Sequence, residues 1–288
     1  MEIIITAVGP DHKGLADPIV HHVTDIGVNI SEIQMFDHRE EAIFAMMLRM
    51  AWDIEPSDEA FKKLKGVMSQ IAEHKGLSIR VWSPDERADK PNIAICVTHR
   101  SETPLAILHA IKSGELNANP AVMIGNRDTC KEIAVQNNID WHNIGDEKGT
   151  ADDEKMIALF DQYNVDYVAL ARYMRVLPAE SCWKYAGGRI INLHHGLLPS
   201  FPGLKPYHDA YSVNMLTFGC TCHFIIPELD AGNQIINQST FSVSPGTPLK
   251  KVIRIGQADN EPKCLVEGLR RVVNREVKLH FHRVVSTA

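Results

Sequence analysis

The chain has 288 residues, of which 44% are hydrophobic, which is enough apolar material for one large or two modest buried cores. Its formal net charge is −6, and no Lys/Arg cluster is interleaved with aromatic residues, which argues against nucleic acid and favours a small-molecule ligand. No apolar run reaches the roughly 18 residues of a membrane span, and residues 1–14 lack the features of a signal peptide. We therefore expect a cytoplasmic protein with no membrane partner.

The cysteines are scattered without the spacing of a metal finger, so we expect buried, reduced thiols. Cys220 and Cys222 lie two apart in a strand-like run and would share one face of that strand. A zinc site built from them and the nearby histidines is not favoured, because the ligand spacing of such sites is missing. The six cysteines are Cys96, Cys130, Cys182, Cys220, Cys222 and Cys264.

The first part of the chain predicts a β-α-β-β-α-β order, which is the ferredoxin-like arrangement. Apolar runs indicate the strands, and amphipathic periodicity indicates the two helices. Ser57 is the candidate N-cap of the second helix. The expected strands are 2–9, 28–36, 42–50 and 77–82, and the expected helices lie within 10–27 and 57–76.

A polar stretch, SPDERADKPN, follows at residues 83–92 and reads as a linker, because its prolines and charges cannot pack a core. After it, apolar strands alternate with helical segments, which predicts a doubly wound, mostly parallel sheet with both faces covered. We therefore expect three parts, a first domain at 1–83, a linker at 84–92 and an α/β domain at 93–288.

A group of polar residues stands at the end of one predicted strand of the second domain, in INLHHGLLPSFPG. Asn192 and His194 are two apart, so they project together at the carboxyl end of the strand, where α/β sheets bind ligands. The Asn amide can hold an oxyanion and the His can relay a proton, while Asp230, farther along, could orient the His or accept a proton from water. The set suits attack on a carbonyl carbon, although Asn-x-His can also be a structural hydrogen-bonded pair, and His195, His208 and His223 can be ordinary turn or core residues.

Two longer motifs, INLHHGLLPSFPGLKPYHDAY and GCTCHFIIPELDAGNQIINQ, resemble the folate-dependent formyltransferase family. The first fifty residues, with VGPDHKGL and IGVNISEIQMF, resemble an ACT domain. This pairing, which covers the whole chain, is similar to that of the formyltetrahydrofolate deformylase family.

The resemblance implies catalytic roles for Asn192, His194 and Asp230. It also places Met174, Arg175, Val176 and Leu177 where the pteridine of the folate meets backbone and apolar side chains; read alone, YMRVL is a plain strand-to-loop exit.

Two features favour the deformylases over the related glycinamide ribonucleotide formyltransferases. His195 stands where the transferases have Pro, and VTHRSETPL lacks the glycines with which they hold a phosphate. The implied acceptor is therefore water, which His195 would help to position. Gly196 departs from the usual Ser, and LDAGNQIINQ has one residue more than the family pattern, so the catalytic rate and the fit of the substrate are open.

The function implied is hydrolysis of 10-formyltetrahydrofolate to tetrahydrofolate and formate, which would supply formate and balance one-carbon pools for purine synthesis. No cofactor and no metal are expected, since the folate is the substrate. Two alternatives are a formyltransferase with an amine acceptor and a non-catalytic sensor of folate or amino acids.

The ACT resemblance also implies an amino-acid effector, glycine or methionine, between paired subunits of a homodimer or homotetramer. The residues concerned are Gly9, Asp11, Gly14 and Leu15, with Asp11 facing the ammonium group and helix amides facing the carboxylate. A dimerisation module without a ligand is the alternative.

Overall fold

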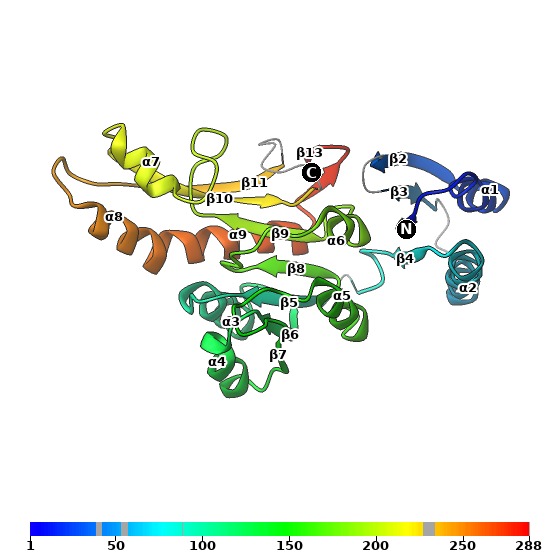
Figure 1. The fold of residues 1–288 in the computed structure, drawn as a ribbon, viewed down its shortest axis with the longest axis horizontal. Coiled ribbons are helices and arrows are strands. Elements are labelled where there is room, and N and C mark those ends of the chain that lie inside the picture. The colour runs from blue at the N-terminus through cyan, green and yellow to red at the C-terminus, as the bar shows by residue number, and fades with distance from the viewer. Residues whose placement is uncertain (39–41, 53–56, 88, 227–233, 288) are drawn as a thin grey trace. The chain divides into compact units, whose positions relative to one another are not determined.

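The computed structural model describes residues 1–38, 42–52, 57–87, 89–226 and 234–287. It divides into two compact units, Met1–Ala88 with Leu177–Gly187, and Asp89–Val176 with Gly188–Ala288. Each unit has a sheet of its own, shown with the ribbon in Figure 1. In the described part of the chain, no helix is both long and apolar enough to cross a membrane.

The first unit confirms the predicted β-α-β-β-α-β order, and its four strands form an antiparallel sheet in the order β2-β3-β1-β4. Helix α2 begins where the sequence predicts, because the Ser57 side chain accepts a hydrogen bond from the Ala60 amide at 3.2 Å. The helix ends at Gly76, whose φ of 66° suits glycine. The elements are β1 (Glu2–Pro10), α1 (Asp17–Asp25), β2 (Asn29–His38), β3 (Ile43–Ala51), α2 (Asp58–Lys75) and β4 (Ser78–Trp82).

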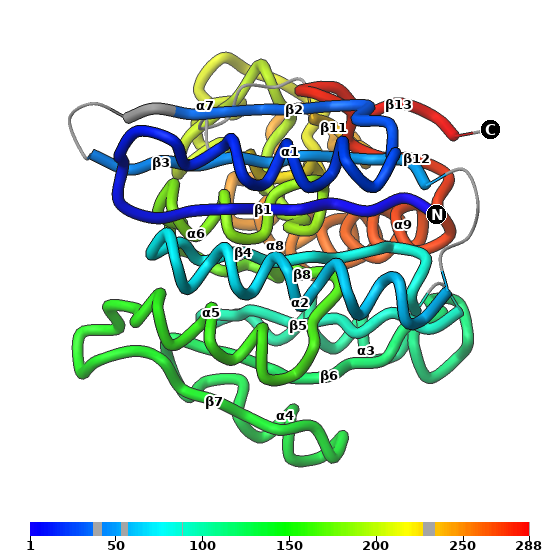
Figure 2. The backbone as a smooth tube through the Cα atoms, turned by 90° about the vertical axis from the view of Figure 1, so that its right-hand side faces the viewer, coloured from blue at the N-terminus to red at the C-terminus, as the bar shows by residue number. Residues whose placement is uncertain are grey.

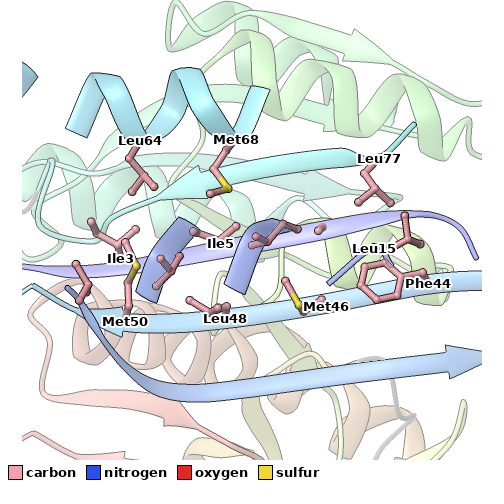
Figure 3. Packing of buried hydrophobic residues seen from close by; sticks show 14 of the residues in the cluster. Ile3, Ile5, Leu15, Phe44, Met46, Leu48, Met50, Leu64, Met68 and Leu77 are labelled. Carbon is pink, nitrogen blue, oxygen red and sulfur yellow. The ribbon is translucent and has the colours of Figure 1, made fainter. Parts of the chain in front are cut away.

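One face of this sheet carries the core of the unit. Ile3, Ile5 and Ala7 alternate along β1 and point toward the two helices, which run across the same face of the strands in Figure 2. Leu64 and Met68 of α2 reach the strands from the helix side (Figure 3). Burying each such side chain contributes about 1.5 to 3 kcal/mol, so this face accounts for much of the stability of the unit.

The opposite face of the sheet packs against helix α6 (Ala179–Lys184), although α6 is far away in the sequence. The Thr6 hydroxyl donates to the Lys184 carbonyl at 3.1 Å, and the rings of Phe36 and Trp183 lie 6.0 Å apart. The sequence-based range of 93–288 for a single second domain therefore differs from the structure. Residues 177–187 group with the first unit because their apolar side chains are buried there.

A buried ion-pair network lies on this second face. Arg49 is 3% exposed, and its Nε lies 3.0 Å from a carboxylate oxygen of Glu32, which is also 3% exposed. The same guanidinium pairs with Glu2 and donates to the carbonyl of Gly187 at 3.3 Å. Charges this deeply buried are stable only when paired, so the stability of the first unit depends on Arg49.

The second unit confirms the predicted α/β architecture. Its sheet has the order β11-β10-β9-β8-β5-β6-β7, with parallel pairing from β9 to β7 and antiparallel pairing at β10 and β11. The strands are β5 (Asn92–Val97), β6 (Asn119–Gly125), β7 (Trp141–Asn143), β8 (Tyr167–Leu170), β9 (Ile190–His194), β10 (Thr217–Phe224) and β11 (Ile235–Ser242), with the hairpin β12 (Val277–His280) and β13 (Arg283–Ser286). The helical segments are α3 (Glu102–Ser113), η1 (Asp128–Cys130), α4 (Lys131–Gln136), α5 (Asp153–Gln162), α7 (Pro206–Ser212), α8 (Leu249–Ile255), η2 (Gly256–Asn260) and α9 (Glu261–Val273).

The cysteines behave as the sequence predicts. All six are buried, and each is a free thiol. Burial raises the pKa of the Cys96 and Cys222 thiols, so they pack as small apolar side chains.

Candidate active site

The strand order of the second unit reverses next to β5, where the chain leaves β7 and continues with β8 on the other side. In open α/β sheets, ligands bind beyond the carboxyl ends of the strands at such a switch point. Thr98 follows β5, and residues 171–176 follow β8. Leu170 of β8 is paired with Asn192 of β9, so the predicted catalytic strand ends at the same edge.

Asn192 is held by its cross-strand neighbour His223 on β10. The His223 Nδ1 lies 3.0 Å from the Phe224 carbonyl, which can only accept, so this nitrogen is the donor. In the neutral ring Nε2 is then the acceptor, and it lies 3.1 Å from the amide nitrogen of Asn192. This contact determines which way the Asn192 amide faces.

The position of His223 coincides with an irregularity in the sheet. The register between β10 and β11 shifts between Cys222 and His223, as in a β-bulge. Bulges near active sites re-aim side chains, and His223 is 4% exposed and turned toward Asn192. The sequence motif G-C-T-C-H contains this residue, but its role as a partner of Asn192 follows from the pairing of β9 with β10.

His194 is 7% exposed and has a defined hydrogen bond. Its Nε2 lies 2.8 Å from the Phe201 carbonyl, which requires Nε2 to be the donor. The other nitrogen, Nδ1, is then the basic one in the neutral ring, and it is the atom of His194 that can accept a proton.

The turn after His194 is fixed by two residues that the sequence analysis did not single out. The Thr221 hydroxyl donates to the Gly196 carbonyl at 2.8 Å and accepts from the Leu198 amide at 3.0 Å. The Gln238 side chain donates to the Leu198 carbonyl at 2.8 Å. Both residues belong to the quoted motifs, as the Thr of G-C-T-C-H and the final Gln of I-I-N-Q.

Gly196 is tightly enclosed. A Cβ at this position would lie 2.3 Å from Cβ of Pro206 and 2.9 Å from the Phe201 carbonyl oxygen. The packing around Gly196 therefore leaves no room for the Ser side chain that the family usually has at this position.

Gly196→Ala is expected to lower the kcat for the folate substrate that the motifs predict by roughly ten- to a hundredfold, because the Phe201 carbonyl that holds His194 must shift. Steady-state kinetics with circular dichroism would test this. Gly66→Ala, in α2 with open space around it, is the matched control and should leave kcat unchanged. Full activity of Gly196→Ala would show that this packing does not position His194.

The predicted folate segment is anchored from β5. Thr98 donates to the side chain of Asn126 at 2.8 Å and accepts from the Met174 amide at 3.0 Å. Met174, Arg175 and Val176 are exposed. Leu177 differs, since it is buried and belongs to the first unit.

His195 lies between two rings, with centroids 5.7 Å from His194 and 6.1 Å from Tyr207. Burial and the positive charge of Arg172, with a smaller effect of His194, lower the pKa of His195 from 6.5 to about 3. The imidazole is therefore neutral at physiological pH and can accept a hydrogen bond from water.

The free energy of unfolding is expected to fall as the pH drops from about 6.5 toward 3, because the unfolded chain protonates His195 while the folded chain does not. The direct check is NMR of the imidazole, which should show no titration of His195 down to pH 5. A midpoint near 6.5 would contradict the buried, neutral assignment.

Asp230 lies outside the described residues, so its contacts are not assigned.

The predicted effector residues lie in the first unit. Asp11 and Gly14 are exposed beside the start of α1, Gly9 is half-buried near the end of β1, and Leu15 is 2% exposed in the core. Leu15 therefore packs the domain rather than facing a ligand.

Comparison with known proteins places the chain in a family. Residues 2–82 match the ACT domain, and residues 91–269, more than half of the chain, match the formyl transferase family. The formyltetrahydrofolate deformylase of Synechocystis sp. is 30% identical over 96% of this chain and 92% of its own length. This chain belongs to the formyltetrahydrofolate deformylase family.

Other members and solved structures agree. The Escherichia coli K12 formyltetrahydrofolate deformylase is 30% identical over 98% of this chain and 97% of its own length. A crystal structure of the deformylase from Pseudomonas syringae has a TM-score of 0.66 at 27% identity, covering 100% of this chain and 95% of that one. Glycinamide ribonucleotide transformylase 1 from Symbiobacterium toebii has a TM-score of 0.63 at 26% identity, covering 69% of this chain and 95% of that one.

Within the deformylase family, this chain is a hydrolase whose second unit carries the expected Asn and His at the end of β9. Among the residues that the structure describes, no group of His, Cys, Asp and Glu is arranged to hold a metal ion.

Proposed function

We propose that this chain hydrolyses 10-formyltetrahydrofolate to tetrahydrofolate and formate. The observation that carries the proposal is the Asn192 and His223 pair, in which the Asn192 amide nitrogen lies 3.1 Å from His223 Nε2 and so has a fixed orientation on the strand that ends at His194. A fixed donor at that edge stabilises an oxyanion, since it needs no reorganisation during the reaction. The full-length similarity to named deformylases supports the same activity.

In the proposed reaction the oxygen of a water attacks the formyl carbon. His194, with Nδ1 as the basic nitrogen, and Asp230 take up the proton of the water. The tetrahedral oxyanion is held by Asn192 and protonated His194. Collapse breaks the bond between the carbon and N10, and N10 receives the proton held by His194 and Asp230. The remaining proton of the new carboxyl group passes to solvent, and formate leaves.

The folate is proposed to bind along residues 174–176, where exposed Met174 and Val176 supply apolar contact. The hydrogen bond from the Met174 amide to Thr98 supports a fixed backbone there. Leu177, although in sequence next to them, supports the packing of the first unit instead.

Water as the acceptor is supported by His195, a neutral acceptor beside His194. The similarity to a glycinamide ribonucleotide transformylase favours one alternative, transfer to an amine. The sensor alternative predicts binding without turnover.

The deciding experiment measures formate and tetrahydrofolate released from 10-formyltetrahydrofolate without an amine, for the purified chain and for Asp230→Asn. Release that depends on Asp230 is expected. Release only after addition of glycinamide ribonucleotide would indicate a transferase, and equal release by the variant would indicate background hydrolysis.

For the first unit we propose binding of glycine or methionine near Asp11 and Gly14 in a homodimer or homotetramer. Exposure of both residues at the start of α1 supports this. Calorimetry with each amino acid and sedimentation of the chain are the tests. If neither amino acid gives a heat of binding or changes turnover, only a dimerisation role is left.

A cytoplasmic supply of formate for purine synthesis is the proposed physiological role.

A further inference from the structure

Arg172 is a buried arginine at the switch point of the second sheet. It follows β8 by two residues and is 7% exposed. Its backbone is in the left-handed region, with a φ of 62°, which is uncommon for a residue other than glycine and which tends to be found at functional sites. Arg172 had no role in the sequence-based prediction.

A carboxylate occupies one edge of this guanidinium. Glu261, which is 1% exposed at the start of α9, has an oxygen 3.3 Å from Nε of Arg172. The other oxygen of Glu261 accepts the hydroxyl of Tyr207 at 3.0 Å. Glu261 is therefore held from two sides, by the Tyr207 hydroxyl and by the Arg172 guanidinium.

The guanidinium has unused donors. Within the described residues, neither Nη1 nor Nε of Arg172 makes a hydrogen bond, and both atoms are buried. Buried donors in native proteins are nearly always satisfied, so an unsatisfied one needs an explanation such as a bound ion or ligand. An arginine fork matches the two oxygens of a carboxylate.

The position of Arg172 relates these donors to the reaction. Leu170, two residues before it, is paired with Asn192 of the neighbouring strand, and the charge of Arg172 lowers the pKa of His195. His195 in turn lies against Tyr207, the residue that holds Glu261. These relations connect the donors of Arg172, through Glu261 and Tyr207, with His195, the neighbour of His194.

We propose that Nη1 of Arg172 binds the small carboxylate product, formate, in a site walled by Glu261, Tyr207 and His195. The inference rests on the proposed function for the identity of the ligand. The anion forms beside Asn192 and His194 and moves onto a fixed positive donor. Glu261 partly neutralises Arg172, so binding is weak enough for release.

The test is a titration of the full chain with ¹³C-formate, followed by NMR line broadening, with sodium chloride added to keep the ionic strength constant. Arg172→Met/Glu261→Gln removes the donor without leaving a buried, unpaired carboxylate. Its formate affinity should be about tenfold lower or worse. Arg254→Met, which removes an exposed arginine on α8, is the control for the loss of an arginine outside the site and should bind like the unmodified chain.

Several outcomes would overturn the site. These are formate binding that is equal in the double variant, no binding to the unmodified chain, and chloride displacing formate at equal concentration. Circular dichroism and binding of tetrahydrofolate by the double variant show that it is folded. Because formate binding is measured without turnover, failure of this site and failure of the proposed hydrolysis are separate results.

Discussion

Asn192→Ala is expected to lower the kcat for hydrolysis of 10-formyltetrahydrofolate by a factor on the order of 10² to 10³, because one oxyanion donor contributes about 3 to 4 kcal/mol. The KM should change little, since the amide acts on the charge that develops in the transition state. Stopped-time assays of tetrahydrofolate formation measure both constants. A loss below about tenfold would remove Asn192 from the mechanism.

His223→Phe is the companion variant. It keeps Asn192 but removes the acceptor that orients the amide at 3.1 Å, so its loss of kcat should lie between the unmodified chain and Asn192→Ala. The double variant should be no worse than Asn192→Ala alone, because both changes remove one interaction. Additive losses would mean that His223 acts on the reaction independently.

Arg49→Met is expected to lower the free energy of unfolding by about 3 to 5 kcal/mol, since Glu32 would keep a buried carboxylate without its guanidinium partner. Urea denaturation of the full chain, followed by tryptophan fluorescence, reports the loss.

Arg49→Met/Glu32→Gln is the control for this prediction. Removing both charges replaces the pair by neutral groups, so most of the lost stability should return. If the single variant loses less than about 1 kcal/mol, the pair behaves like an exposed one and the burial of Arg49 does not matter.

The sequence predicted those parts of the fold that depend on local pattern. Ser57 and the amphipathic run after it defined α2, and alternating strands and helices defined the parallel sheet. The strand end at Asn192 and His194 could be found because two residues of one strand share a face.

The remainder depends on contacts between distant segments. His223 is the partner of Asn192 only because β9 pairs with β10. Glu261 and Arg172 form an ion pair although they are 89 positions apart in the sequence. β7 has three residues, which is too short for a periodic signal. The burial of α6 on the first sheet could not be predicted, because its apolar side chains equally suit the second core.

The chain passes through the first unit twice, and the second passage, at residues 177–187, lies in the sequence between the proposed folate segment, 174–176, and strand β9. We therefore expect removal of residues 1–88 to expose Trp183 and its neighbours, in the stretch of chain that connects residues 174–176 with β9. The N-terminal part is accordingly no detachable accessory. A shortened protein that begins at the linker should aggregate or lose turnover even in the absence of any effector. A lower activity of such a truncated protein would then report the lost packing of residues 177–187 and not a loss of regulation.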